Sequence, residues 1–231
     1  MLPNAFLMLK LSLVALISFK FVGATPTGNV KTPVSLRIEG AKTTIYEGIV
    51  FTKGHILPPH PLAPAYTAMV PISTPILGLD RRVSALDDAA RKNGFPWDGT
   101  YFPKFDDIFI TSIGGDTQTD TQFWGILLNY EFPEVGGCQQ QTRSFLRLMP
   151  FNANAFLKLT GPHVARVNQP ITLTVTNGST GATIEGANIK GVRSDANGQA
   201  IITFDHPGLH TVKADKQKAI RSNRLDVTVR P

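Results

Sequence analysis

Apolar and hydroxyl side chains alternate with a period of two along the last third of the chain. The alternating runs lie at residues 171–176, 200–204, 209–213 and 225–229. This period is typical of strands that bury one face. Short sequences rich in Asn, Asp and Gly, such as Asn177-Gly178, separate the runs and supply the conformations that tight turns need. The pattern predicts a small β-sandwich at the C-terminal end.

The preceding region mixes strand patterns with one helix pattern. We expect strands at residues 33–38, 43–51, 106–113 and 123–129. Residues 84–94 have the composition of a helix, with Ser84 as its cap, Asp87 in its first turn and Asn93-Gly94 at its end. One helix with four or more strands predicts a small α+β domain. The chain as a whole is therefore expected to be mainly β, with two domains.

The first 24 residues are interpreted as a signal peptide. Residues 5–24 are almost entirely apolar, Lys10 precedes an apolar core, and Val22-Gly23-Ala24 supplies the small residues that precede a cleavage site. The alternative is a membrane anchor, but Lys10 and Lys20 interrupt the run of about 20 apolar residues that a span needs. We therefore expect a secreted, extracellular protein with no membrane span after the signal is removed.

Composition and charge exclude some classes of protein. The 231 residues are 42% hydrophobic and 17% charged, which excludes a disordered chain. The formal charge of +6 becomes +4 when Lys10 and Lys20 leave with the signal peptide. The basic residues are scattered, so we expect no nucleic-acid partner. Asn177-Gly178-Ser179 is an acceptor sequence for glycosylation of Asn177; the alternative is a plain turn.

Two sets of motifs carry a resemblance to known domains. The first set lies at residues 34–40, 45–48, 84–90, 95–100, 113–115, 123–129 and 136–139. It resembles a secreted domain family of unknown function that is similar to the C-terminal β domain of vitamin B12 carriers such as transcobalamin. The second set, at 186–187, 194–198 and 220–223, looks like an immunoglobulin-like repeat. The resemblance implies a transcobalamin-like α+β domain over 31–156, followed by an immunoglobulin-like β-sandwich over 157–231.

Two stretches depart from this family, at residues 54–83 and 142–150. The family usually has Cys-Asp-Gly-Thr-Asn where this chain has residues 67–72. A shift of reading frame there, and a second shift over residues 142–151, would restore family-like sequences. We hypothesise that both stretches are out of frame. A restored cysteine near residue 69 would give Cys138 a disulfide partner that it lacks in the sequence as given; the alternatives are a buried thiol and an intermolecular bond.

The chemistry-bearing residues do not form a recognisable catalytic or metal-binding pattern. His206 and His210 flank a Pro-Gly turn and do not share a helix face, and His55 and His60 lie in the first departing stretch. We expect no metal site and no cofactor. Cys138 has no neighbouring histidine in an ordered-looking segment, so we expect no nucleophilic enzyme. A rapid reaction of Cys138 with a thiol probe would favour an enzyme.

Aromatic side chains are concentrated between residues 97 and 130. Four of these aromatic residues and one asparagine are the candidate ligand-binding residues: Trp97, Tyr101, Trp124, Tyr130 and Asn129. Aromatic side chains with polar tips favour contacts with sugars, corrins or proteins, although they also build cores. A corrinoid site inherited from the B12 carriers is not expected, because the chain lacks their large helical domain.

These observations favour a non-enzymatic protein that binds extracellular or cell-surface partners. The partner is expected to be a protein or a glycan, with the C-terminal sandwich acting as a spacer or adhesion module. The alternative is a carrier of a small corrinoid- or glycan-type ligand that uses the aromatic span.

Overall fold

The computed structural model describes residues 31–53, 81–102, 107–132, 146–150 and 155–231. Within these residues the chain is mainly β, with several small sheets and one helix. Residues 1–24, Cys138, His55, His60 and most of the stretch 54–83 lie outside the described residues. Described residues up to 150 are called the N-terminal part below, and residues 155–231 the C-terminal part.

A four-stranded sheet forms the centre of the N-terminal part. Its order is β2 (Thr44–Thr52), β1 (Thr32–Glu39), β7 (Leu146–Pro150) and β6 (Trp124–Leu128). β1 is antiparallel to β2 and parallel to β7, which is antiparallel to β6. The strands expected at 33–38, 43–51 and 123–129 are confirmed. β7 lies within the stretch 142–150, which we hypothesised to be out of frame.

The helix α1 (Arg81–Asn93) packs on β1 and β2. Its buried side chains, Leu86 among them, join Leu36, Ile38 and Ile113 in one apolar core. The prediction of Ser84 as the cap was wrong, because the helix begins at Arg81 and Ser84 is buried in its interior.

The predicted helix end is confirmed at Asn93. Gly94 has a φ of +72°, and its N–H donates to the carbonyl of Ala90 at 2.8 Å. This left-handed residue closes the last turn, and glycine adopts the conformation without steric cost. We expect Gly94→Ala to lower the free energy of unfolding by about 1 kcal/mol. Chemical denaturation would measure the change; an unchanged midpoint would show that the left-handed turn is not needed.

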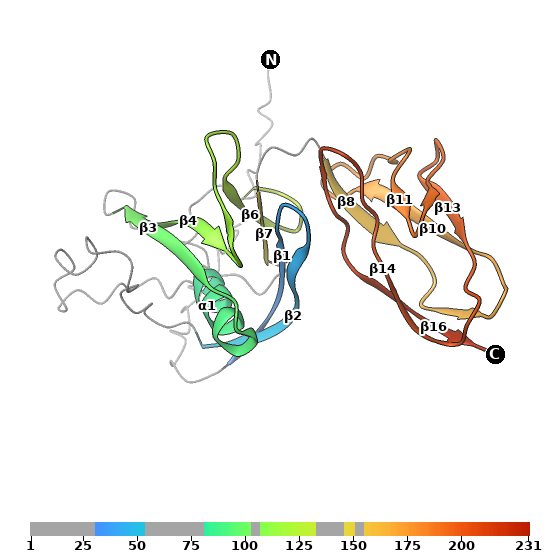
Figure 1. Ribbon diagram of the computed structural model, residues 1–231, viewed down its shortest axis with the longest axis horizontal. Helices are drawn as coiled ribbons and strands as arrows, with labels where there is room; N and C mark the ends of the chain where they lie inside the picture. Colours follow the sequence, from blue (N-terminus) through green and yellow to red (C-terminus); the bar gives the residue numbers. More distant parts are fainter. Residues whose placement is uncertain (1–30, 54–80, 103–106, 133–145, 151–154) are drawn as a thin grey trace, which may run out of the picture.

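A second, three-stranded sheet follows α1 in the chain, and its residues Trp97, Ile110 and Ile113 pack in the same core as the helix (Figure 1). It contains β3 (Trp97–Phe102), β4 (Asp107–Ile113) and β5 (Asp116–Thr117), in that order. The strand expected at 106–113 is confirmed as β4. β3 was not among the strands expected from the sequence.

Two sheets enclose the core of the C-terminal part. The first has the order β13 (Gln199–Ile202), β10 (Ile171–Asn177), β8 (Ala155–Thr160) and β15 (Ala219–Ile220). The second has the order β14 (Gly208–Val212), β16 (Leu225–Arg230) and β9 (Val164–Arg166), and β11 (Asn188–Ile189) pairs with β12 (Val192–Arg193). Side chains from both larger sheets, including Leu173 and Val227, share one core. The four alternating runs of the C-terminal third are confirmed as strands.

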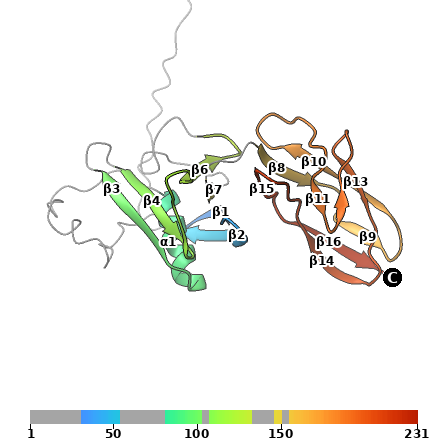
Figure 2. The ribbon, with the colours of Figure 1, turned by 45° about the horizontal axis from the view of Figure 1, so that its top comes forward.

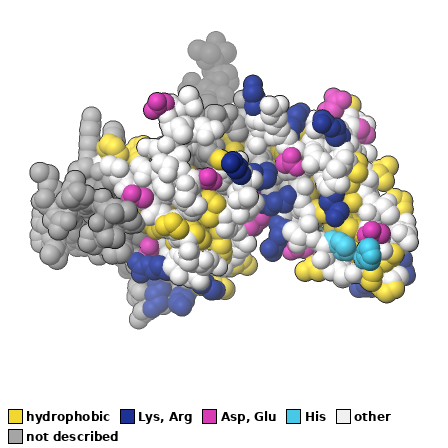
Figure 3. Space-filling view, viewed as in Figure 1, with side chains coloured by type: hydrophobic (Ala, Val, Ile, Leu, Met, Phe, Trp, Pro, Cys, Tyr) yellow, Lys and Arg dark blue, Asp and Glu magenta, His cyan; other side chains and the backbone are white. Residues whose placement is uncertain are grey.

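The two parts lie side by side, with the β1–β2 hairpin facing the C-terminal part (Figures 1 and 2). Each part has its own large apolar core. In the space-filling view, Lys and Arg side chains gather along the boundary between the parts (Figure 3). This boundary, called the junction below, is where residues far apart in the sequence meet.

Candidate functional site

A small apolar cluster is shared by the two parts at the junction. Leu127 of β6 is fully buried and packs with Ile220 of β15, and Phe156 of β8 packs against both. The ring of Phe132 meets that of Phe156 edge to face, with centroids 6.0 Å apart. Burial of these side chains stabilises the contact between the parts, because apolar area is removed from water.

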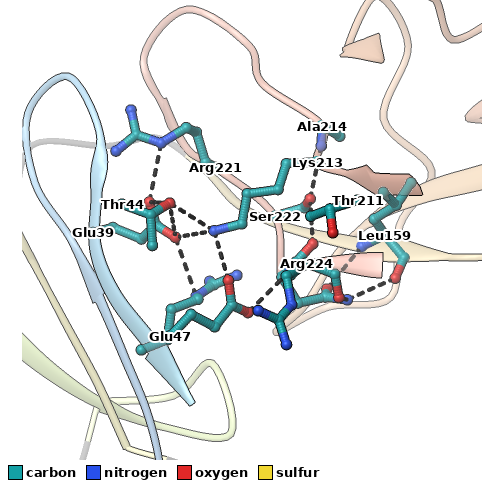
Figure 4. Close-up of polar contacts among 12 residues, drawn as sticks. Glu39, Thr44, Glu47, Leu159, Thr211, Lys213, Ala214, Arg221, Ser222 and Arg224 are labelled. Atoms are coloured by element: carbon teal, nitrogen blue, oxygen red, sulfur yellow. Dashed lines mark hydrogen bonds and ion pairs between the residues drawn. The ribbon is translucent and has the colours of Figure 1, made fainter. Parts of the chain in front are cut away.

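Beside this cluster, the carboxylate of Glu39 is the centre of a polar network (Figure 4). Glu39 ends β1 and is 1% exposed. From the C-terminal part, Lys213 Nζ lies 2.7 Å from its Oε1 and Arg221 Nε lies 3.0 Å from its Oε2. The hydroxyl of Thr44 donates to the same carboxylate at 3.0 Å. A buried carboxylate is stable in such a place only when it is paired and hydrogen-bonded, as it is here.

The guanidinium of Arg221 also holds the turn that connects β1 and β2. Its two terminal nitrogens donate to the carbonyls of Lys42 at 2.9 Å and Gly40 at 2.8 Å. Within the turn, the Gly40 N–H donates to the Thr43 carbonyl at 2.9 Å. The planar fork of an arginine suits three such acceptors at once, whereas a lysine could not match their geometry. Arg221 therefore pairs with the charge of Glu39 and also holds the β1–β2 turn in position.

Glu47 extends the network along β2. Its Oε2 lies 2.8 Å from Lys213 Nζ, and its Oε1 accepts a hydrogen bond of 3.0 Å from the main-chain N–H of Arg224. Lys213 is thus shared between two carboxylates of the N-terminal part. Because the side chains of Lys213 and Arg221 are each only 21% exposed, solvent screens these pairs less than it screens surface pairs.

Tyr130 reaches across the junction from the N-terminal part. It follows Asn129 in a two-residue turn closed by hydrogen bonds between Leu128 and Glu131. The φ angles of Asn129 and Tyr130 are +50° and +74°, the pattern of a type I′ turn, which normally has glycine second. Tyr130 is only 8% exposed, and a Cβ added at Gly178 would collide with its ring. The ring therefore packs directly against the backbone of the C-terminal part.

Asn223 receives Tyr130 on the other side of the junction. The hydroxyl of Tyr130 donates to Asn223 Oδ1 at 3.2 Å. The same amide group accepts from the Leu159 N–H and donates to the Leu159 carbonyl, both at 3.0 Å. The side chain thus takes the place of a neighbouring strand for β8. It connects Tyr130 to the frame of the C-terminal part.

A groove opens next to Tyr130 and receives residues from both parts. Its volume is about 590 Å³. The lining residues are Asn129 and Tyr130 of the N-terminal part, and Lys158, Leu159, Thr160, Gly161, His163, Gly178, Asn223, Arg224 and Leu225 of the C-terminal part. This size is within the range of binding sites for small molecules. The groove is complete only when the two parts are together.

The aromatic residues expected to bind a ligand are divided between the core and the groove. Trp97 packs against the core of the N-terminal part, and its Nε1–H donates to Asp87 Oδ1 at 3.2 Å. Trp124 belongs to the same core, and its Nε1–H donates to the Asp116 carbonyl at 3.2 Å. Asn129 and Tyr130 line the groove instead. Tyr101 lies in β3, and nothing is described of its side chain.

Asn177 ends β10 next to the groove residue Gly178. Its Oδ1 accepts a hydrogen bond from the Ser179 N–H at 3.0 Å, which makes an Asx turn of the acceptor sequence. Ser179 and Thr180 are exposed, so the turn lies at the surface. Glycosylation of Asn177 stays a prediction, and the turn is compatible with it.

His206 and His210 form hydrogen bonds within their own turn of the C-terminal part. His206 pairs with Asp205 at 2.8 Å, and His210 Nε2 bonds to the His206 carbonyl at 2.9 Å. The hydrogen bond from His206 lowers the pKa of the Asp205 carboxyl. A carboxyl whose pKa is lower in the folded than in the unfolded protein stabilises the fold at pH above the unfolded-state pKa. That stabilisation is lost as the pH falls through the folded-state pKa. For Asp205 the contribution is negligible, because the pair is exposed to solvent.

The structure also bears on two other expectations from the sequence. Within the described residues, no three His, Cys, Asp or Glu side chains come together in a way that could hold a metal ion. The described part of the chain likewise contains no helix both long and apolar enough to cross a membrane.

No known family, curated protein or solved structure matches the chain.

Sequence reasoning selected Asn129 and Tyr130 but did not identify Glu39, Arg221 or Asn223 as site residues. Glu39, Arg221 and Asn223 each lie within a motif that carries the family resemblance, at residues 34–40 and 220–223. Nothing in either motif alone shows that the two meet. Polar residues between strands at both places were the available signal, and only the folded chain brings them together.

Proposed function

We propose that this chain is a secreted, non-enzymatic protein that binds extracellular or cell-surface material, with a protein or a glycan as its partner. In this proposal a transcobalamin-like α+β domain over residues 31–156 is followed by an immunoglobulin-like β-sandwich over 157–231. The observation that carries it is the junction, where Glu39 and Tyr130 join two separately packed cores and leave a groove shared by both. Such a fixed pair of β domains suits recognition by shape.

The use of the charged residues at the junction supports a binding role over a catalytic one. Both oxygens of Glu39 are engaged with Lys213 and Arg221 of the opposite part. A general base needs a lone pair that can reach a substrate proton, and a nucleophile needs such a base beside it. The carboxylate is instead used to hold the two parts together.

The carrier hypothesis has a separate observation in its favour, the groove lined by Asn129 and Tyr130. It would use these residues rather than the indoles, because the N–H groups of Trp97 and Trp124 are hydrogen-bonded within the N-terminal part. A soluble small ligand would then bind without retention of the protein on any surface.

A retention experiment tests the proposal. The protein, expressed with its own N-terminal segment, is collected from the culture medium and incubated with insoluble cell-wall or matrix material. We expect it to sediment with that material and to leave it chemically unchanged. Absence from the medium would contradict secretion, and shortened or modified material would indicate an enzyme. Failure to sediment, with saturable binding of a small ligand, would favour the carrier.

A further inference from the structure

Within the described residues, the basic side chains around the groove make no hydrogen bond or ion pair across the junction. Lys158 and Arg224 are cationic, and none of the eleven lining residues is acidic. Lys158 and His163 are exposed at the surface of the C-terminal part. A concave surface with one sign of charge concentrates ligands of the opposite sign. An anionic group is therefore the ligand that this lining favours.

The side chain of Arg224 is held in place while its fork remains open. Its Nε lies 3.1 Å from Asp226 Oδ2, and the side chain is 49% exposed. Arg224 contributes to the junction through its main-chain N–H, which donates to Glu47 Oε1. In the contacts of the described residues, neither terminal nitrogen of Arg224 has a partner. Two such nitrogens match the two oxygens of a carboxylate.

Asp226 also orients His163. The Nδ1 of His163 lies 3.0 Å from the main-chain carbonyl of Asp226. Because a carbonyl oxygen can only accept, Nδ1 carries the proton, and in the neutral ring Nε2 is an acceptor. The third polar atom of Asp226, Oδ1, accepts from the Thr211 hydroxyl at 2.7 Å, which fixes the aspartate itself. Arg224 and His163 are thus positioned by one residue that does not line the groove.

The remaining lining suits a ligand rich in hydroxyl groups. Asn129 is exposed and offers an amide, and Thr160 offers a hydroxyl oxygen that can accept while its proton is donated to the Thr174 carbonyl at 3.4 Å. Amide and hydroxyl side chains both donate and accept, as sugar hydroxyls do. The amide of Asn223 is already bonded to Leu159 and Tyr130, so it forms part of the wall. The groove of about 590 Å³ has room for one or two sugar rings.

We propose that the groove binds a sugar acid, with its carboxylate on the fork of Arg224 and near Lys158. The hydroxyls of the sugar bond to Asn129, Thr160 and Nε2 of His163. This inference rests on the proposed function, because it names the ligand class of the binding protein. The same chemistry comes from a free uronate or from a uronate unit of an acidic polysaccharide.

Calorimetric titration of the secreted protein tests this assignment. The probes are galacturonate, a galacturonate trimer, and galactose as the neutral counterpart. We expect saturable binding of at least one acid and none of galactose. The double variant Lys158→Gln, Arg224→Gln should bind that acid at least about tenfold more weakly, because charge-assisted hydrogen bonds are lost. The matched variant Lys92→Gln, Arg193→Gln removes two exposed cations elsewhere and should bind as the unaltered protein does.

Each outcome has a definite meaning. Binding of galacturonate and the trimer supports a site for a single sugar acid, and binding of the trimer alone supports a site for a polysaccharide. Binding of neither acid, equal binding of galactose, or unaltered binding by the double variant overturns the assignment. If the acids fail while the protein still sediments with cell-wall or matrix material, the groove assignment fails and the proposed function stands. We expect the double variant to fold, because the main-chain hydrogen bond from residue 224 to Glu47 does not depend on the side chain of Arg224. Unfolding curves of the double variant would verify this.

Discussion

The substitution Glu39→Gln is expected to lower the free energy of unfolding by about 3 kcal/mol, because it removes the carboxylate that pairs with Arg221 and one of the two carboxylates that pair with Lys213. Lys213 and Arg221 lie 2.7 and 3.0 Å from the carboxylate, and Arg37 Nε lies 3.6 Å from it. Glutamine keeps the shape but not the charge. The two parts should also become less coupled. Differential scanning calorimetry would then show a broadened or split transition in place of a single one.

Two controls separate the charge effect from a general loss of stability. Glu185 is exposed in the C-terminal part, so Glu185→Gln should change stability by no more than about 0.5 kcal/mol. Adding Lys213→Met to Glu39→Gln completes a double-mutant cycle for this ion pair: because either single substitution already breaks the pair, the double variant should lose less stability than the sum of the two single losses. If the double variant were as unstable as the sum of the two single variants, the electrostatic explanation would be wrong.

Substitutions of Tyr130 are expected to give an unusual order of stability. Tyr130→Phe loses one hydrogen bond of 3.2 Å and should cost about 1 kcal/mol. Tyr130→Ala also removes the ring that packs on Gly178 and should cost about 3 kcal/mol. Tyr130→Gly removes the same ring but relieves the φ of +74°, so it should be about 1 kcal/mol more stable than the alanine variant.

Urea denaturation of the three variants would measure this order. Glycine usually destabilises relative to alanine, so a more stable glycine variant is a specific sign of the left-handed turn. The opposite order would show that the turn conformation at Tyr130 contributes no strain. A phenylalanine variant as unstable as the alanine variant would place most of the ring's contribution in its hydroxyl.

Much of the fold could be predicted from the sequence, because periodicity and turn residues are local signals. The alternation at 171–176 predicted β10, and the Asn93-Gly94 pair predicted the end of α1. The beginning of α1 could not be predicted in the same way. Arg81 and Arg82 precede the apolar spacing, and Ser84 matched the preference for a cap while packing in the interior. At Ser84, burial in the folded protein outweighs the preference of serine for the helix-capping position.

The junction could be predicted only in its parts. Tyr130 was selected as a polar aromatic residue, but its partner Asn223 lies in the other half of the chain. Trp97 and Trp124 are, like Tyr130, aromatic residues with a polar group, but they pack in the core of the N-terminal part. Residue type therefore does not distinguish a core aromatic from one at a boundary. The difference arises from which strand faces the second part, a long-range property of the fold.

The place of β7 in the N-terminal sheet has a consequence for how the chain folds during synthesis. β7 lies between β1 and β6, and it pairs Leu36 with Leu146. Until residue 150 has emerged from the ribosome, the apolar strand β1 has an open edge, and such edges promote aggregation. Parallel pairing between distant segments is also slow to form. A nascent chain that stalls before β7 would thus be a substrate for chaperones, and the first part can close only after most of it has been made.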